Sequence, residues 1–416
     1  MPVDHPTPSA LDYLLFDPAP FGFPAPVLPL LAPLRRGALQ WPAPAGRPQP
    51  AWSGNGRLYS RARYALHDAY RLCGVGQSGT LLAPAYHCRT MLDPALALGG
   101  PIGLYHLQAD LTPDLGDIAQ RIQQAAVPVR ALLAAHFFGL RQDFAALAAL
   151  CRQHGVALIE DCAHALPLRH PANGMGSTGT WCVASPYKFF PCDDGGVLWP
   201  GSGQAWPSAP ALPPLQPPGW RAVAGQWRNQ LRRLRQRPPP SPVPLAAGAA
   251  AAALPPLSAA GRRALALHQR LQGPSADYQP TRERLACSGL SRWLIAHADI
   301  HQIVTRRRAN FLQWVAAVQG LPQAQAPWQR LGAHDTPYMF PLWIDQPEQR
   351  FPALKRAGLP IWRWDSLAAS SCATSAGYRL HLLQLPCHQG LSAADMDWMI
   401  NTVHRVLAMP LAEAGA

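Results

Sequence analysis

Side chains that can do chemistry follow apolar segments in the middle of this sequence. His136 follows one such segment, Asp161 lies at the end of the next, and Lys188 comes shortly after a third. Lys188 is one of only two lysines among the 36 basic residues, so its position is informative. A lysine can bind a carbonyl group as a Schiff base, and a carboxylate can keep a ring nitrogen protonated. With an anion site nearby, this set suits an enzyme that uses pyridoxal phosphate.

An anion site is predicted at the start of a helix expected over 62–73. Arg61 and Arg63 flank Ala62 at the point where helical spacing begins. Free backbone amides and the helix dipole favour a phosphate group at a helix N-terminus. This helix is therefore expected to contribute to the same site as the lysine and the carboxylate.

The region from 58 to 198 alternates strand-like and helix-like segments. The alternation predicts an α/β fold in which a mostly parallel sheet has helices on both faces. Ligands of such sheets bind at the carboxyl ends of the strands, where these side chains lie. The expected strands are 80–83, 103–107, 131–135, 156–159 and 180–184, and further helices are expected around 90–98 and after Asp143.

Composition divides the chain into four parts. We expect an N-terminal extension over 1–50, the core of a large domain over 51–200, an insertion and linker over 201–275, and a smaller C-terminal α+β domain over 276–416. In the last part, strands are expected at 338–344, 359–362 and 379–383, and helices at 351–357 and 393–407.

Residues 201–260 contain thirteen prolines, six arginines and no acidic residue. Within them, apolar residues recur at helical spacing among arginines, which predicts a basic amphipathic helix over 220–237. Its apolar stripe is expected to pack on this protein or on a dimer partner. Contact with anionic lipid, nucleic acid or a nucleotide-bearing substrate is the alternative. The stripe consists of Trp220, Val223, Trp227, Leu231 and Leu234.

Several protein classes are not expected. No uninterrupted apolar run approaches the roughly 18 residues of a transmembrane helix, and the apolar stretch at 21–34 lacks the features of a secretory signal. The nine cysteines are scattered, with no CxxC pair, which favours reduced thiols and a cytoplasmic location. No ligand spacing indicates a metal site.

The motifs together resemble one known family. Residues 158–165 (LIEDCAHA), 185–188 (SPYK) and 194–196 (DGG) resemble the DegT/DnrJ/EryC1/StrS aminotransferases, and segments 84–88 and 135–139 extend the likeness upstream. These are fold-type-I pyridoxal phosphate enzymes that make amino sugars. The resemblance is dense over 57–198 and returns more weakly at 306–310 and 337–388. It does not cover 201–260.

The resemblance implies roles for the central residues. Lys188 would form the Schiff base and shuttle a proton between substrate and cofactor. Asp161 would hold the pyridine nitrogen, and His164 would lie near the ring hydroxyl. Ser185 would bind the cofactor phosphate together with the start of the helix at Ala62 and Arg63.

Other expected roles concern ring stacking and the substrate. Cys88 aligns with the aromatic residue that stacks on the ring in the family, so the candidates for that face are Tyr86 and His87. His136 is a candidate for contacting substrate. The candidates for an arginine that binds the carboxylate of the amino donor are Arg363 and Arg379.

The sequence also departs from the family pattern. The usual Ser-Gly-Thr before the first helix is Arg61-Ala62-Arg63, and the serine five residues before the lysine is Val183. An asparagine-rich segment that the neighbouring subunit contributes in the family has no clear counterpart. These departures concern the phosphate site and the substrate more than they concern Lys188.

The leading hypothesis is a homodimeric, pyridoxal-phosphate-dependent aminotransferase. It would move an amino group from glutamate or glutamine to a keto group on a nucleotide sugar or a related cyclic polyol. One alternative is a dehydratase or lyase using the same cofactor, against which Lys188 argues because related dehydratases carry histidine there. Another is a non-catalytic basic protein that binds a surface. Nucleic acid is not an expected partner.

Overall fold

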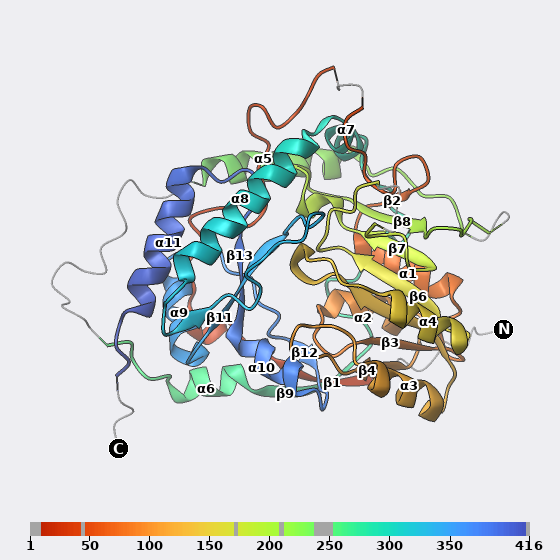
Figure 1. Ribbon diagram of the computed structural model, residues 1–416, viewed down its shortest axis with the longest axis horizontal. Coiled ribbons are helices and arrows are strands. Elements are labelled where there is room, and N and C mark those ends of the chain that lie inside the picture. Colours follow the sequence, from red (N-terminus) through yellow and green to blue (C-terminus); the bar gives the residue numbers. More distant parts are fainter. Residues whose placement is uncertain (1–9, 43–45, 170–173, 208–211, 237–252, 413–416) are drawn as a thin grey trace.

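The computed structural model describes residues 10–42, 46–169, 174–207, 212–236 and 253–412. A seven-stranded sheet dominates the half that carries the motifs (Figure 1). Its order is β2-β8-β7-β6-β5-β3-β4, and the five strands from β7 to β4 are parallel while β8 and β2 are antiparallel to their neighbours. The strands are β2 Arg57–Tyr59, β3 Thr80–Pro84, β4 Ile102–Tyr105, β5 Val129–Ala135, β6 Ala157–Cys162, β7 Trp181–Ala184 and β8 Gly196–Pro200.

Helices cover this sheet in two pairs. The first pair packs together at the β8 and β3 side, and the second lies against β4 and β6 (Figure 1). The central strands are buried along nearly their whole length, as expected for parallel strands covered on both faces. The pairs are α1 Ala62–Leu72 with α2 Arg89–Ala97, and α3 Leu115–Gln124 with α4 Ala145–Gln153.

This arrangement confirms the predicted α/β class and the mostly parallel sheet. Each strand expected between 80 and 184 is present, with bounds that differ by a few residues. Turn glycines end two helices where the sequence predicts an end: Gly74 follows α1 and Gly155 follows α4, both with positive φ. The helix α3, capped by the Asp114 carboxylate, was not predicted.

The C-terminal part is built on a small antiparallel sheet. Strand β11 Met339–Ile344 lies between β10 Ala324–Gln325 and β13 Leu382–Pro386. Four helices accompany the sheet, and α8 was not predicted although it is the longest. They are α8 Ile300–Val318, α9 Pro347–Arg356, α10 Ala373–His381 and α11 Ala393–Leu407.

Two expected strands of this part are corrected. Residues 373–381 form α10 and only 382–386 form β13, so Arg379 lies on a helix. Segment 359–362 makes one isolated bridge, from Trp362 to Gln384, and no strand. In both places packing against neighbouring elements decides the backbone conformation, and a segment of four or five residues carries too little pattern to predict it.

The N-terminal residues pair with distant parts of the chain. Strand β1 Ala10–Leu15 lies between β9 Leu267–Gln272 and β12 Leu367–Ala368, antiparallel to both. Farther along, the Val27 N–H donates to the Gly358 carbonyl and the His388 ring bonds the Pro29 carbonyl. Residues 10–42 therefore run along the C-terminal part of the molecule.

The predicted amphipathic helix is present as α5 Trp220–Arg235, but its polar side, and not its apolar stripe, packs on the protein. Its buried residues are Gln226 and Gln230, whereas Trp220 is 75% exposed and Trp227 is 48% exposed. The expectation that the stripe packs on this chain is therefore wrong. Polar contacts hold the inner side, among them a hydrogen bond from the Ser288 hydroxyl to Gln226. Ser288 caps α7 Gly289–His297, beside α5 in Figure 1.

Two short helical pieces contact each other near the N-terminal segment. The 3₁₀ turn Ala19–Phe21 contacts α6 Ala259–Leu265. Among the helices described, none combines the length and the apolar character needed to cross a membrane.

At Gly139 the segment that follows β5 packs closely against the segment that precedes β11. A Cβ atom there would lie 2.2 Å from the Thr336 carbonyl oxygen and 2.7 Å from that of His164, and φ is +89°. Next to it, the Tyr338 N–H donates to the Phe138 carbonyl at 2.7 Å. Any side chain at 139 therefore separates the two chain segments.

We expect Gly139→Ala to destabilise the protein more than Gly155→Ala does. Both have positive φ, which costs alanine about 1–2 kcal/mol, but no atom lies within 4 Å of a Cβ at 155. The clash at 139 should add about 1–3 kcal/mol. Urea unfolding of the two variants measures the difference, and equal losses would contradict the close approach described here.

Candidate active site

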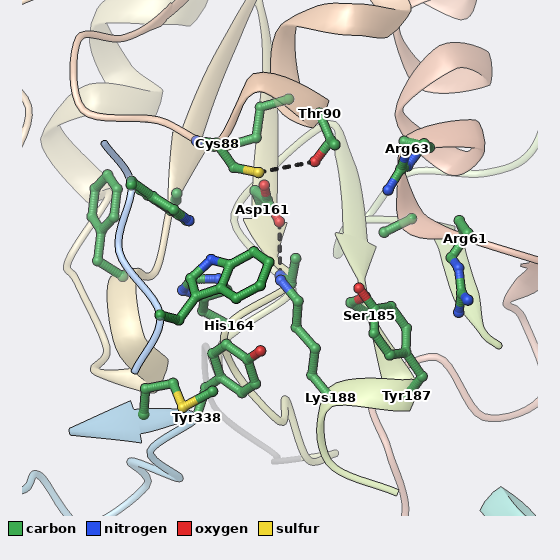
Figure 2. Close-up of a pocket in the computed structure, with 18 of the residues that line it drawn as sticks. Arg61, Arg63, Cys88, Thr90, Asp161, His164, Ser185, Tyr187, Lys188 and Tyr338 are labelled. Atoms are coloured by element: carbon green, nitrogen blue, oxygen red, sulfur yellow. Dashed lines mark hydrogen bonds between the residues drawn. The ribbon is translucent and has the colours of Figure 1, made fainter. Parts of the chain in front are cut away.

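A cavity of about 320 Å³ opens at the carboxyl ends of the central strands (Figure 2). Asp161 and Lys188 lie in it, and both come from segments that the sequence singled out. The start of α1 forms one side, and residues of the C-terminal part form the other. The remaining predicted residues that line it are Ala62, Arg63, Cys88, His136, His164 and Ser185.

Strand β6 places two consecutive carboxylates on opposite faces. Because side chains alternate along a strand, Asp161 faces the cavity while Glu160 faces the other side. Asp161 is 4% exposed, and its Oδ1 accepts a hydrogen bond from the Ala163 N–H at 2.7 Å. Burial raises the pKa of Asp161, while the Ala163 N–H and the Lys188 charge act in the opposite direction. In Figure 2 the Lys188 side chain points toward Asp161.

Glu160 organises the strand ends behind the cavity. The His136 Nε2–H donates to Oε1 at 2.8 Å, the Gly176 N–H donates to the same oxygen, and the N–H groups of Thr178 and Gly179 donate to Oε2. Burial acts to raise the pKa of Glu160, but these donors outweigh it and the pKa is lowered. Both oxygens of this carboxylate are therefore fully engaged by the protein.

These bonds decide the placement of His136. Its Nδ1 accepts from the Gln142 N–H at 3.0 Å and its Nε2 bonds Glu160, so both ring nitrogens have protein partners although the ring reaches the cavity wall. Cys162 lies near the same carboxylate, and His136, Glu160 and Cys162 are close enough to bind a metal ion together. The hydrogen bonds leave no oxygen of Glu160 free for that purpose.

A buried arginine fixes the backbone of the lysine. The Arg307 guanidinium is fully buried and donates to the Lys188 carbonyl at 2.8 Å and to the Pro337 and Tyr338 carbonyls at 3.1 Å each. Its Nε donates to Gln389 Oε1, at 2.8 Å. Burial lowers the pKa of Arg307 to about 10, below its usual range. The resemblance extended to 306–310, but the sequence suggested no role for Arg307.

The start of α1 closes the anion end of the cavity. Arg61 is the N-cap and makes no side-chain cap, so the first amides of the helix, at Ala62 and Arg63, face the cavity rim. Gly196 makes this possible, because a Cβ there would lie 2.2 Å from the Arg61 carbonyl carbon. Ser185, only 2% exposed, faces the same space.

The candidates for ring stacking divide clearly. Tyr86 and His87 are fully buried and do not line the cavity. The His87 Nε2 accepts from the Ala368 N–H, and its Nδ1 lies 3.0 Å from two backbone carbonyls. Cys88 does line the cavity, with its thiol 3.2 Å from the Thr90 hydroxyl. Cys88 and Ala163 line the cavity together with Asp161.

His164 lies against aromatic rings at the cavity wall. Its ring centroid is 4.7 Å from that of Tyr338 and 5.0 Å from that of Trp364. Burial lowers its pKa well below the usual value, with a smaller contribution from Lys188, so the ring is neutral. Its buried Nδ1 has no hydrogen-bond partner among the described residues. A ligand hydroxyl in this cavity would supply such a partner.

Neither predicted substrate arginine lines the cavity. Arg363 pairs with Asp365 at 3.2 Å, and its guanidinium lies 3.6 Å from the centre of the Phe351 ring. Arg379 donates to the carbonyls of Asp365, Leu15 and Leu265. Both arginines hold backbone segments together. The guanidinium groups that do line the cavity in the described structure are those of Arg61 and Arg63.

Several cavity residues were not predicted from the sequence. Trp362, Trp364 and Tyr338 bring aromatic rings to one side, and Leu30 and Leu31 of the N-terminal segment complete it. Trp362 is 49% exposed at the cavity rim. The sequence signal that could have found two of them is the pair of tryptophans that flanks Arg363.

Comparison with known proteins now bears on this site. Residues 59–211 match the DegT/DnrJ/EryC1/StrS aminotransferase family. The match confirms the resemblance over the segment that holds Asp161 and Lys188. A curated relative, the "Pleiotropic regulatory protein" of Geobacillus stearothermophilus, is 29% identical over 154 residues, 34% of this chain. The chain spans 40% of that relative's length.

Solved structures share the fold over most of the chain. The aminotransferase TlmJ from Streptoalloteichus hindustanus has a TM-score of 0.56 at 18% identity, covering 85% of this chain and 86% of its own. The sugar aminotransferase CalS13 from Micromonospora echinospora gives 0.54 at 17%, covering 85% and 88%. Helicobacter pylori PseC, an aminotransferase involved in the biosynthesis of pseudoaminic acid, gives 0.55 at 11%, covering 85% and 86%. At these identities the likeness confirms the fold-type-I architecture.

We expect Glu160→Gln to lower the free energy of unfolding at pH 7 by about 3 kcal/mol, since three backbone N–H groups lose a charged acceptor. The folded-state pKa of Glu160 is lowered from 4.5, so its contribution is complete above the unfolded pKa. It is lost as the pH falls through the folded pKa. Urea unfolding between pH 7 and 3 should show a constant gap between wild type and variant that closes at the acid end. A gap that widens there would contradict this account.

Proposed function

We propose that this protein is a pyridoxal-phosphate-dependent aminotransferase that acts on a keto sugar or a related cyclic polyol. The observation that carries the proposal is the placement of Lys188 and buried Asp161 in one cavity with the start of α1. The match over 59–211 supports it. The orphaned Nδ1 of His164 and the anion-binding helix start fit a phosphorylated ring that carries a hydroxyl.

The chain's own residues would divide the work. Pyridoxal phosphate supplies an electron sink that makes the bond to hydrogen at the amine-bearing carbon labile. Asp161 would hold the ring nitrogen protonated. Its carboxylate is buried at the cavity, and the Ala163 N–H bonds Oδ1, so Oδ2 can accept from a ring N–H. Lys188 Nζ would anchor the cofactor, then carry the proton between the substrate carbon and the cofactor. Arg307 would keep the lysine backbone in place.

The substrate would lie against the aromatic side of the cavity. Trp362, Trp364 and Tyr338 offer flat faces on which the apolar C–H surface of a sugar or cyclitol ring can stack. We propose glutamate or glutamine as the amino donor. The alternative of a dehydratase or lyase is disfavoured by the presence of Lys188 at the Schiff-base position. A cytoplasmic location is proposed from the nine cysteines, all of which are unpaired.

Lys188→Ala is expected to abolish the visible absorbance band that the protein forms with pyridoxal phosphate. Lys355→Ala is the matched control, because it removes the only other lysine, whose amine bonds the Ile361 carbonyl away from the cavity. Glutamate or glutamine should shift the band in wild type and in the control. A band retained by Lys188→Ala, or none in wild type, would refute the proposal.

We propose that the protein is a homodimer and that the apolar face of α5 lies in the interface. This face consists of Trp220, Val223, Trp227, Leu231 and Leu234. Aromatic residues and arginine are enriched in protein interfaces, and α5 is held to the cavity rim through Asp193. Gln230 and Arg233 bond the Asp193 carboxylate, and the Arg61 side chain bonds the Asp193 carbonyl. A second copy on this face would therefore sit beside the active site.

Trp227→Ser with Leu231→Ser should convert the dimer to a monomer. Light scattering after gel filtration should give twice 45.1 kDa for wild type and 45.1 kDa for the double variant. Leu312→Ser, at an equally exposed apolar position on α8, should remain dimeric. A monomeric wild type that binds anionic vesicles in a salt-dependent way would instead support the basic surface-binding alternative.

A further inference from the structure

Two side chains at the anion end of the cavity have no assigned contact. They are Arg61, which the sequence placed at the anion site without a specific partner, and Tyr187, for which the motifs predict no role. The Arg61 Cζ lies 4.6 Å from the centre of the Tyr187 ring, and both side chains line the cavity. In Figure 2, Tyr187 lies between Lys188 and the two arginines, beside Ser185.

We propose that Arg61 and Tyr187 bind the phosphate group of the cofactor, together with Arg63, Ser185 and the first amides of α1. The proposal rests on the aminotransferase function proposed above. The ligand chemistry is that of a phosphate monoester. The site replaces the Ser-Gly-Thr and the additional serine of the family pattern with charged and phenolic donors.

The placement of Tyr187 supports this assignment. Val183, where the family has a serine, is fully buried and apolar, so that position supplies no donor. Tyr187 lies four residues farther on, directly before the lysine, and lines the cavity. Ser185, only 2% exposed, lines the cavity as well. Two hydroxyl donors therefore lie at this end of the cavity.

The charges of Arg61 and Arg63 also support it. Arg61 bonds the Asp193 carbonyl, and among the described residues it has no carboxylate partner, because the Asp193 carboxylate pairs with Arg233. Arg63 lies 3.9 Å from the carboxylate of Asp277, which is 75% exposed. The positive charge at this end is thus weakly compensated. A doubly charged phosphate meets two guanidinium groups and a helix N-terminus there.

The positive charges around the Tyr187 hydroxyl are consistent with a phosphate site. Burial would raise the pKa of its hydroxyl, but the charges of Lys188, Arg61 and Arg63 outweigh burial and the pKa is lowered. A more acidic phenol is a better hydrogen-bond donor to a phosphate oxygen. Stacking under Arg61 also fixes the ring, so the hydroxyl loses little rotational freedom on binding.

The test compares two ligands that differ only in the phosphate group. Wild type and variants are titrated with pyridoxal phosphate and with pyridoxal, following tryptophan fluorescence and visible absorbance. Tyr187→Phe should weaken pyridoxal phosphate binding about 10-fold and Arg61→Met about 30-fold or more, the range of charge-assisted hydrogen bonds. Neither variant should change the affinity for pyridoxal.

Tyr338→Phe is the matched control, because this tyrosine lines the same cavity on the side away from the arginines (Figure 2). It should change both affinities by the same factor. Thermal melting of each variant checks that it is folded, and Tyr187→Phe alone suffices if Arg61→Met does not fold.

The outcomes separate the two proposals. An unchanged affinity ratio in Tyr187→Phe, or an equal loss for both ligands, would overturn the phosphate assignment and leave the aminotransferase proposal standing. If wild type binds neither ligand, the proposed function fails first. A ratio that falls in Tyr187→Phe and holds in Tyr338→Phe supports the assignment.

Discussion

The alternation of side chains along β6 is the constraint on which the site depends. Because consecutive residues face opposite sides of a strand, Glu160 can bond segments next to β5 and β7 while the Asp161 carboxylate faces the cavity. A shift of one residue in the register with β5 or β7 would exchange the two carboxylates. Glu160, whose two carboxylate oxygens are both bonded by the protein, therefore stabilises the register that places the Asp161 carboxylate in the cavity.

The fold and the centre of the site could be predicted because the signals there are local. Asp161 ends a short apolar run, and Lys188 follows one within four residues of its last strand position. Helix ends at Gly74 and Gly155 are marked by residues that take positive φ cheaply. Each of these features is determined by neighbours in sequence, so a reading of spacing and residue type is sufficient.

The features that the sequence did not predict correctly depend on contacts with residues far along the chain. Arg379 is held by carbonyls at Leu15 and Leu265, more than a hundred residues away, and no spacing rule indicates such contacts. The role of Trp362 and that of Leu30 arise from two distant segments meeting at one cavity. Helix α5 was predicted, but its orientation was not, because two glutamines find buried polar partners and turn the stripe outward.

The bonds made by Arg307 have a mechanical consequence. This arginine belongs to α8, and it ties the Lys188 peptide to the segment that enters β11. A hinge motion between the lysine and the C-terminal part would therefore break buried hydrogen bonds of this guanidinium. A molecule that enters the cavity without that cost would pass lining residues that Arg307 does not hold, among them Trp362, which is 49% exposed, and the partly buried Leu30 and Leu31.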